Sequence, residues 1–190
     1  MKDIKNSKNI VYIPGWMDRG KIHGFQNSRD VWAKERNTQL DIEARYIIGH
    51  SVGALIALDC WQRKKDPHLI LVGPLVPQRS LLVWLWRWMK FIFYEGIPLS
   101  SERLKTFLYI VQGTVKLAKL LRSDPLAIIE QVPKENILII RGKDDLFFCG
   151  EEVMRIFKEK GVPTIEVAGV GHNWRPEIDT IIEEYLLGKI

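Results

Sequence analysis

Short apolar runs separated by longer mixed segments dominate the hydrophobic pattern of this 190-residue chain. The runs are rich in Ile, Leu and Val and fall at residues 9–13, 45–48, 69–72, 137–140 and 164–167. Continuous apolar runs of this kind are typical of strands that are buried on both faces. A segment with helical spacing follows most of them. This alternation predicts an α/β protein with a mostly parallel sheet of about five or six strands and helices on both faces.

A long apolar segment interrupts the alternation between residues 74 and 132. It contains three helix candidates, namely a Trp-rich one at 80–94, a second at 101–121 and a short third one after Asp124-Pro125. In the first helix Arg87, Lys90 and Tyr94 form a narrow polar stripe opposite a wide apolar face. This helix is too short, and carries too many internal cations, to span a bilayer.

Charge is concentrated in this same segment. From residue 78 to residue 132 it holds eight Lys and Arg against four Asp and Glu, a net charge of +4 out of the chain's +5. The rest of the molecule is therefore almost neutral. Outside this segment the chain lacks the interleaved basic and aromatic residues of a nucleic-acid groove, so we expect no nucleic-acid partner.

Composition indicates a single domain over residues 1–190. With 46% apolar residues the chain can bury a substantial core. Its two cysteines, Cys60 and Cys149, give no disulfide framework, and we expect both to be free thiols in a reducing compartment. The first nine residues are polar and charged, unlike a secretory signal, so we expect a cytoplasmic protein.

The four histidines differ in the roles expected of them. His23 lies in a polar loop and His68 opens a strand, and neither has metal-ligand spacing with a cysteine or a carboxylate cluster. His50 is expected to pack as a structural histidine. We therefore expect no metal site and no other cofactor.

The pentapeptide Gly49-His50-Ser51-Val52-Gly53 is the most informative motif of the chain. It stands between an apolar strand candidate and a helix candidate that opens with small residues. On such a tight turn a serine is held in a strained conformation with its hydroxyl exposed, and the residues two before and two after must be small. Gly49 and Gly53 meet this requirement, so Ser51 is a candidate nucleophile.

Carboxylates and a histidine follow two later strands. Asp144 and Asp145 come after the strand at 137–140, and His172 lies in a glycine-spaced loop after the strand at 164–167. Parallel strands build their sites at their carboxyl ends, so we expect these groups at the same sheet edge as Ser51. There an imidazole could take the proton of the serine, and a buried carboxylate could orient the imidazole.

With its order of serine, aspartate and histidine, and with its Gly-x-Ser-x-Gly turn, the chain resembles the α/β-hydrolase superfamily. The similarity runs from the first strand to the last helix and is weakest at residues 16–43 and 74–132. The family's acid usually sits in a Gly-x-x-Asp loop, so the resemblance favours Asp145 over Asp144. The family's usual sheet is larger, which implies a reduced version of the fold here.

The resemblance also implies an oxyanion hole. Family members often carry His-Gly-x after the strand that corresponds to residues 9–13, and Pro14-Gly15-Trp16 occupies that place. The backbone N–H groups of Trp16 and of Val52, the residue after the nucleophile, are then the expected donors. Pro14 departs from the histidine, but a main-chain donor does not depend on the preceding side chain. Trp16 is equally a candidate core aromatic.

The long apolar segment lies where this family often inserts a cap, so residues 78–132 are expected to form a mostly helical cap. Three interpretations of its first helix stay open. Its aromatic face could simply pack on the core with the cations solvated. It could also form an acyl pocket lined by Trp84, Trp88 and Phe91. Alternatively, an exposed basic and Trp-rich surface could make a weak contact with an anionic membrane or a partner.

These residues together favour a serine hydrolase that cleaves a carboxylic ester or thioester of an apolar acyl group. In this family a serine nucleophile argues against dehalogenases and epoxide hydrolases, which use aspartate at that position. Acyl transfer to an alcohol or thiol, or a lyase reaction with the same triad, remains open. The alternative from another class is a catalytically silent binding protein on this fold.

Overall fold

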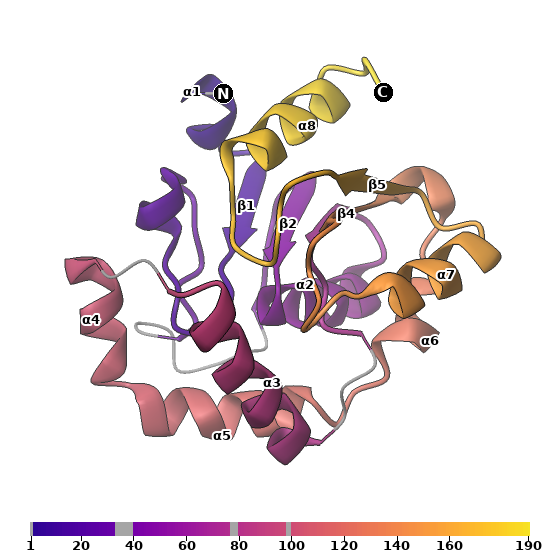
Figure 1. Cartoon of the computed structure of the whole chain (residues 1–190). Coiled ribbons are helices and arrows are strands. Elements are labelled where there is room, and N and C mark those ends of the chain that lie inside the picture. Colours follow the sequence, from indigo (N-terminus) through magenta and orange to yellow (C-terminus); the bar gives the residue numbers. More distant parts are fainter. Residues whose placement is uncertain (1, 33–39, 77–79, 98–99) are drawn as a thin grey trace.

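The computed structural model describes residues 2–32, 40–76, 80–97 and 100–190. Within them lies one five-stranded sheet in which every strand is parallel to its neighbours (Figure 1). The spatial order of the strands follows the chain: β1 (Ile10–Ile13), β2 (Tyr46–His50), β3 (His68–Val72), β4 (Ile137–Gly142) and β5 (Thr164–Val167). The predicted α/β class, strand positions and reduced sheet are therefore confirmed.

Side chains alternate between the two faces of the sheet, as the period of a strand requires. On one face Ile47, Leu69 and Ile139 pack in a core shared with α2 (Val52–Lys64) and α7 (Glu151–Glu159). On the other face the neighbouring strand positions, among them Ile48 and Ile70, pack against α8 (Pro176–Leu186). The sheet is thus buried on both sides, which explains its continuous apolar strands.

The cap segment, residues 78–132, leaves the sheet after β3 and returns before β4. Its described helices are α3 (Leu81–Tyr94), α4 (Ser101–Phe107), α5 (Ile110–Leu120) and α6 (Pro125–Ile129). The first three lie together at the end of the molecule opposite the two termini (Figure 1). The predicted cap segment begins at residues 78 and 79, which lie outside the described residues. No described helix is both long and apolar enough to cross a membrane.

One helix boundary in the cap segment differs from the sequence expectation. The single helix predicted at 101–121 is two helices, α4 and α5, which are separated at Leu108 and Tyr109. The break lets the two pieces face different partners. Thr106 of α4 donates its hydroxyl to the carbonyl of Met17, whereas Leu117 of α5 packs into the core beside α2. A tertiary requirement of this kind leaves no mark on local helical periodicity.

The remaining short elements connect these layers. They are α1 (Lys2–Lys5), the 3₁₀ turn η1 (Gly20–His23) after β1, and the 3₁₀ turn η2 (Lys134–Asn136) before β4. The η1 turn contributes to the site, because it carries His23 to the same region as the end of β2.

Candidate active site

The turn between β2 and α2 holds Ser51 in a conformation that residues other than glycine seldom adopt, with φ 54° and ψ −119°. Its two flanking glycines are required by close packing. A Cβ added at Gly49 would lie 2.7 Å from the Cα of Ala54, and one added at Gly53 would lie 2.2 Å from the carbonyl oxygen of Ile13. The motif therefore forms the strained strand-to-helix turn that the sequence predicts.

Ser51, His172 and Asp145 form a continuous hydrogen-bonded chain. The Nε2 of His172 lies 2.8 Å from Ser51 Oγ, and its Nδ1 lies 2.6 Å from Asp145 Oδ2. All three residues follow the carboxyl ends of parallel strands, namely β2, β4 and β5. The neighbouring carboxylate of Asp144 is exposed, whereas Asp145 is fully buried. The geometry therefore brings together the three predicted residues and leaves Asp144 outside the chain.

The carboxylate of Asp145 is held ionised by the groups around it. Its two oxygens accept the backbone N–H groups of Phe147, Phe148 and Cys149 at 2.9–3.2 Å. Burial by itself would raise its pKa. The charge and hydrogen bond of His172, together with the backbone donors, outweigh this effect and lower the pKa. A charged carboxylate facing Nδ1 fixes the tautomer in which the Nε2 lone pair faces the serine.

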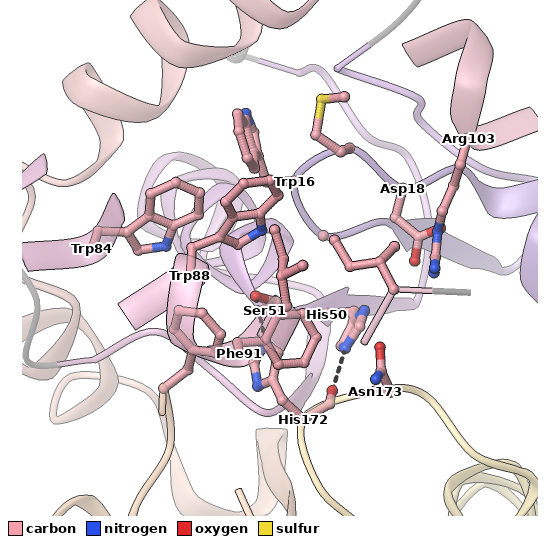
Figure 2. Close-up of a pocket in the computed structure, with 15 residues that line it drawn as sticks. Trp16, Asp18, His50, Ser51, Trp84, Trp88, Phe91, Arg103, His172 and Asn173 are labelled. Carbon is pink, nitrogen blue, oxygen red and sulfur yellow. Dashed lines mark hydrogen bonds and ion pairs between the residues drawn. The ribbon is translucent and has the colours of Figure 1, made fainter. Parts of the chain in front are cut away.

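His50 packs beside this chain as a neutral imidazole. Burial, followed by the nearby charge of His172, lowers its pKa to about 3. Its Nε2 lies 3.2 Å from the carbonyl oxygen of His172, so this nitrogen must carry the proton and donate it (Figure 2). The remaining Nδ1 has no hydrogen-bond partner among the described residues. The predicted packed histidine thus also supports the loop that carries His172.

Sequence spacing did not reveal a second polar cluster next to His50. Asp18 Oδ2 lies 2.6 Å from His23 Nε2, and its Oδ1 lies 3.4 Å from Arg103 Nη2. Ligand atoms of Asp18, His23 and His50 lie within 4.8 Å of one another. The sequence spacing indicated no metal-ligand arrangement for His23, whereas the structure places it beside Asp18, because η1 folds it back toward that residue. The expected absence of a metal stays a prediction.

A cavity of about 320 Å³ opens beside Ser51 and His172. Figure 2 shows Trp84, Trp88 and Phe91, the three predicted binding residues, on one side of Ser51, and Asp18 with Arg103 on the other. The ring of Trp16 lies 4.8 Å, centroid to centroid, from the rings of both tryptophans. The cavity is therefore aromatic on one side of Ser51, and a paired aspartate and arginine line the other side.

Comparison with solved structures identifies the architecture. A thermophilic esterase aligns with a TM-score of 0.62 at 15% identity, over 95% of this chain and 90% of that one. An α/β hydrolase enzyme from a Medee basin deep-sea metagenome library aligns with a TM-score of 0.60 at 16% identity, over 95% and 88%. The chain has the α/β-hydrolase fold. The sequence itself matches no protein-family model and no curated protein.

A third α/β-hydrolase structure comes from a study of carboxylesterases of the thaumarchaeon Nitrososphaera gargenis. It aligns with a TM-score of 0.51 at 18% identity, over 75% of this chain. The present chain spans 64% of the length of that protein. At this level of identity the likeness concerns the fold, and the chemistry has to be argued from the residues of the site.

Within this α/β-hydrolase fold, the cap segment contributes one further polar contact that sequence analysis missed. The carboxylate of Glu95, just after α3, accepts the backbone N–H of His172 at 2.9 and 3.2 Å. Burial raises the pKa of Glu95, although the same hydrogen bonds act in the opposite direction. Glu95 and His172 are 77 residues apart, and no local motif links them.

The loop after β1 lies against the turn that carries Ser51. A Cβ added at Gly15 would lie 3.2 Å from the Cβ of Ser51, so this loop packs directly on the turn. The next residue, Trp16, lines the cavity with its side chain, and Val52 begins α2. Among the described residues, the backbone N–H groups of Trp16 and Val52 donate to no other group. Their role as oxyanion donors stays a prediction.

Proposed function

We propose that this protein is a serine hydrolase that cleaves a carboxylic ester or thioester through an acyl-serine intermediate. The observation that carries the proposal is the hydrogen-bonded chain from Ser51 through His172 to Asp145, which opens onto an apolar cavity. A serine hydroxyl becomes an effective nucleophile when an adjacent imidazole removes its proton, and an ionised carboxylate stabilises the resulting imidazolium.

In the proposed reaction Ser51 Oγ attacks the carbonyl carbon while its proton passes to Nε2 of His172. The carbonyl oxygen becomes an oxyanion, which the backbone N–H groups of Trp16 and Val52 stabilise. When the tetrahedral intermediate collapses, the leaving alcohol or thiol takes the proton from His172. Water then attacks the acyl-serine in the same way, and Ser51 regains its proton as the acid is released.

The cavity suggests the substrate class. One side of it is lined by Trp84, Trp88 and Phe91, which suit an apolar acyl chain better than a charged one. Asp18 and Arg103 on the other side pair with each other, so that side is polar without being strongly charged. The solved esterases with this fold are consistent with ester hydrolysis.

Turnover of a panel of p-nitrophenyl esters from acetate to palmitate, alongside acyl-CoA thioesters, tests the proposal. We expect hydrolysis of at least one apolar acyl substrate by the wild type and its loss in Ser51→Ala. A product formed only when an acceptor alcohol or thiol is added would indicate acyl transfer instead. Binding of these esters without turnover by a folded wild type would favour the binding protein.

A further inference from the structure

The first cap helix, α3, is apolar on two opposite faces. Trp84, Trp88 and Phe91 point inward, and Trp84 is only 1% exposed. Leu82, Trp86, Met89 and Phe93 point outward, and Phe93 is 90% exposed. The outward positions recur every three or four residues, so they form one row along the helix. The aromatic residues Trp86 and Phe93 therefore lie on the opposite face of α3 from Trp84, Trp88 and Phe91.

Exposed apolar side chains also occur on the next two helices. Leu104 lies on α4, Leu108 follows it, and Val111 and Val115 lie on α5. All four are exposed, Leu108 to 83%. We call the exposed apolar residues of α3 (Leu82, Trp86, Met89 and Phe93) and these four together the outer cap face. Soluble monomers rarely expose this many large apolar side chains in one region, and such regions commonly mark a contact with a membrane or another protein.

Charge distinguishes between these two kinds of contact. Among the described side chains of α3, α4 and α5, the exposed charged groups are Lys90, Lys105 and Lys119. Lys90 Nζ lies 5.2 Å from the ring centroid of Trp86. The one acidic residue of these helices, Glu102, is half-buried and pairs with Arg19 and Lys105. The outer cap face therefore combines apolar side chains with positive charge and has no exposed carboxylate among its described residues.

We propose that the outer cap face docks on an anionic lipid bilayer. Apolar side chains would enter the boundary between headgroups and acyl chains, while the lysines would meet lipid phosphates and carboxylates, as in interfacial helices. None of the described helices can cross a bilayer, so α3 would lie in the plane of the surface. A second copy of this chain fits less well, because a twofold contact would bring the lysines of the two copies together.

Helix α3 connects the proposed lipid contact with the catalytic cavity. The inward face of α3 lines the catalytic cavity while its outward face rests on the lipid. A docked protein would therefore hold the cavity one helix thickness from the acyl chains of the bilayer. Docking itself does not depend on the proposed hydrolysis, so the Ser51→Ala variant is expected to dock as well as the wild type.

Co-sedimentation of the full chain with vesicles tests this proposal. We expect the wild type to pellet with phosphatidylserine–phosphatidylcholine vesicles and to stay in solution with phosphatidylcholine alone. Lys90→Glu with Lys119→Glu should weaken binding at least about thirtyfold. Loss of each lysine accounts for about fivefold, and the reversal of its charge adds to this. The matched control, Lys8→Glu with Lys189→Glu, changes the net charge equally at exposed positions near the termini and should bind like the wild type.

The apolar contribution is tested by Phe93→Asp, with Leu187→Asp after α8 as the control at another exposed apolar residue. Phe93→Asp should abolish vesicle binding, and Leu187→Asp should not. Wild-type protein that fails to pellet with anionic vesicles, or equal losses in the two lysine pairs, would overturn the proposal. So would a dimer in light scattering that Phe93→Asp dissociates, because the occupant would then be a second copy.

Discussion

Both carboxylate oxygens of Glu95 accept the backbone N–H of His172, at 2.9 and 3.2 Å. The following residues reinforce this contact, since Asn173 Nδ2 donates to the carbonyl of Gly96 at 3.1 Å. The end of α3 is thereby fixed to the loop that carries the proposed base. The cap segment thus contributes to the position of the imidazole as well as to the walls of the cavity.

Removing the Glu95 carboxylate should slow the reaction by loosening this loop. We expect Glu95→Ala to lower kcat about tenfold or more with little change in KM, since a hydrogen bond to a charged group contributes about 1.5–3 kcal/mol. Glu95→Gln keeps one acceptor oxygen and should recover most of kcat. Steady-state kinetics on a short p-nitrophenyl ester measure both values. If the two variants lose kcat equally, or lose only thermal stability, Glu95 does not position His172.

The assignment of the acid predicts a large difference between adjacent aspartates. Asp145→Asn should lower kcat by about 10⁴, because the amide would favour the wrong imidazole tautomer. Asp144→Asn is the matched control, since Asp144 is exposed and outside the hydrogen-bonded chain, and it should remain within about twofold of the wild type. The same ester assay ranks the two variants, and the opposite ranking would reject the triad as drawn.

The two faces of α3 predict different effects for two neighbouring tryptophans. Trp88→Ala enlarges the cavity and should shift the preferred acyl chain length, while turnover of an acetate ester changes little, because small substrates do not use the remote contact. Trp86→Ala, on the outer cap face, should leave the chain-length profile unchanged. A matching shift in both variants, measured with soluble esters, would show that the effect comes from the helix as a whole.

The Asp18 cluster predicts a defined dependence of stability on pH. Burial would raise the pKa of Asp18, but the hydrogen bond and charge of His23, with Arg103, lower it to about 2. In the unfolded chain the pKa of this carboxyl group is about 4. Ionised Asp18 therefore stabilises the fold by about 2 kcal/mol above about pH 4. This contribution is lost as the pH falls from about 4 through 2.

Urea denaturation of the wild type and Asp18→Asn measures this contribution. The free-energy gap between the two proteins should be widest near pH 6 and should shrink to about half near pH 3. A gap that is constant over this range would mean that the carboxylate charge of Asp18 does not stabilise the fold.

Local patterns were sufficient to predict the sheet and the three residues that form the hydrogen-bonded chain. Apolar runs placed all five described strands, and the two glycines beside Ser51 marked a turn that only glycine can close. The serine, aspartate and histidine each follow a strand, so the shared sheet edge brought them together without knowledge of the helices. These features depend on neighbouring residues or on the general topology of parallel sheets.

Features set by the packing of distant segments could not be predicted in this way. Nothing near Glu95 indicates that its carboxylate meets a backbone 77 residues later. The cluster of Asp18 and His23 is completed by Arg103 of α4 and His50 of β2, which come from distant parts of the chain. On α3 nearly every position is apolar, so the sequence could not show which tryptophans face the cavity and which face outward.

The central claim, that Ser51 is an activated nucleophile, is tested most directly by covalent labelling with a fluorophosphonate. We expect intact-mass analysis of the wild type to show one adduct, tandem mass spectrometry to place it on Ser51, and Ser51→Ala to remain unmodified. His172→Ala should label far more slowly, because its serine would lack a base. A folded wild type that is not labelled at Ser51 would contradict the account.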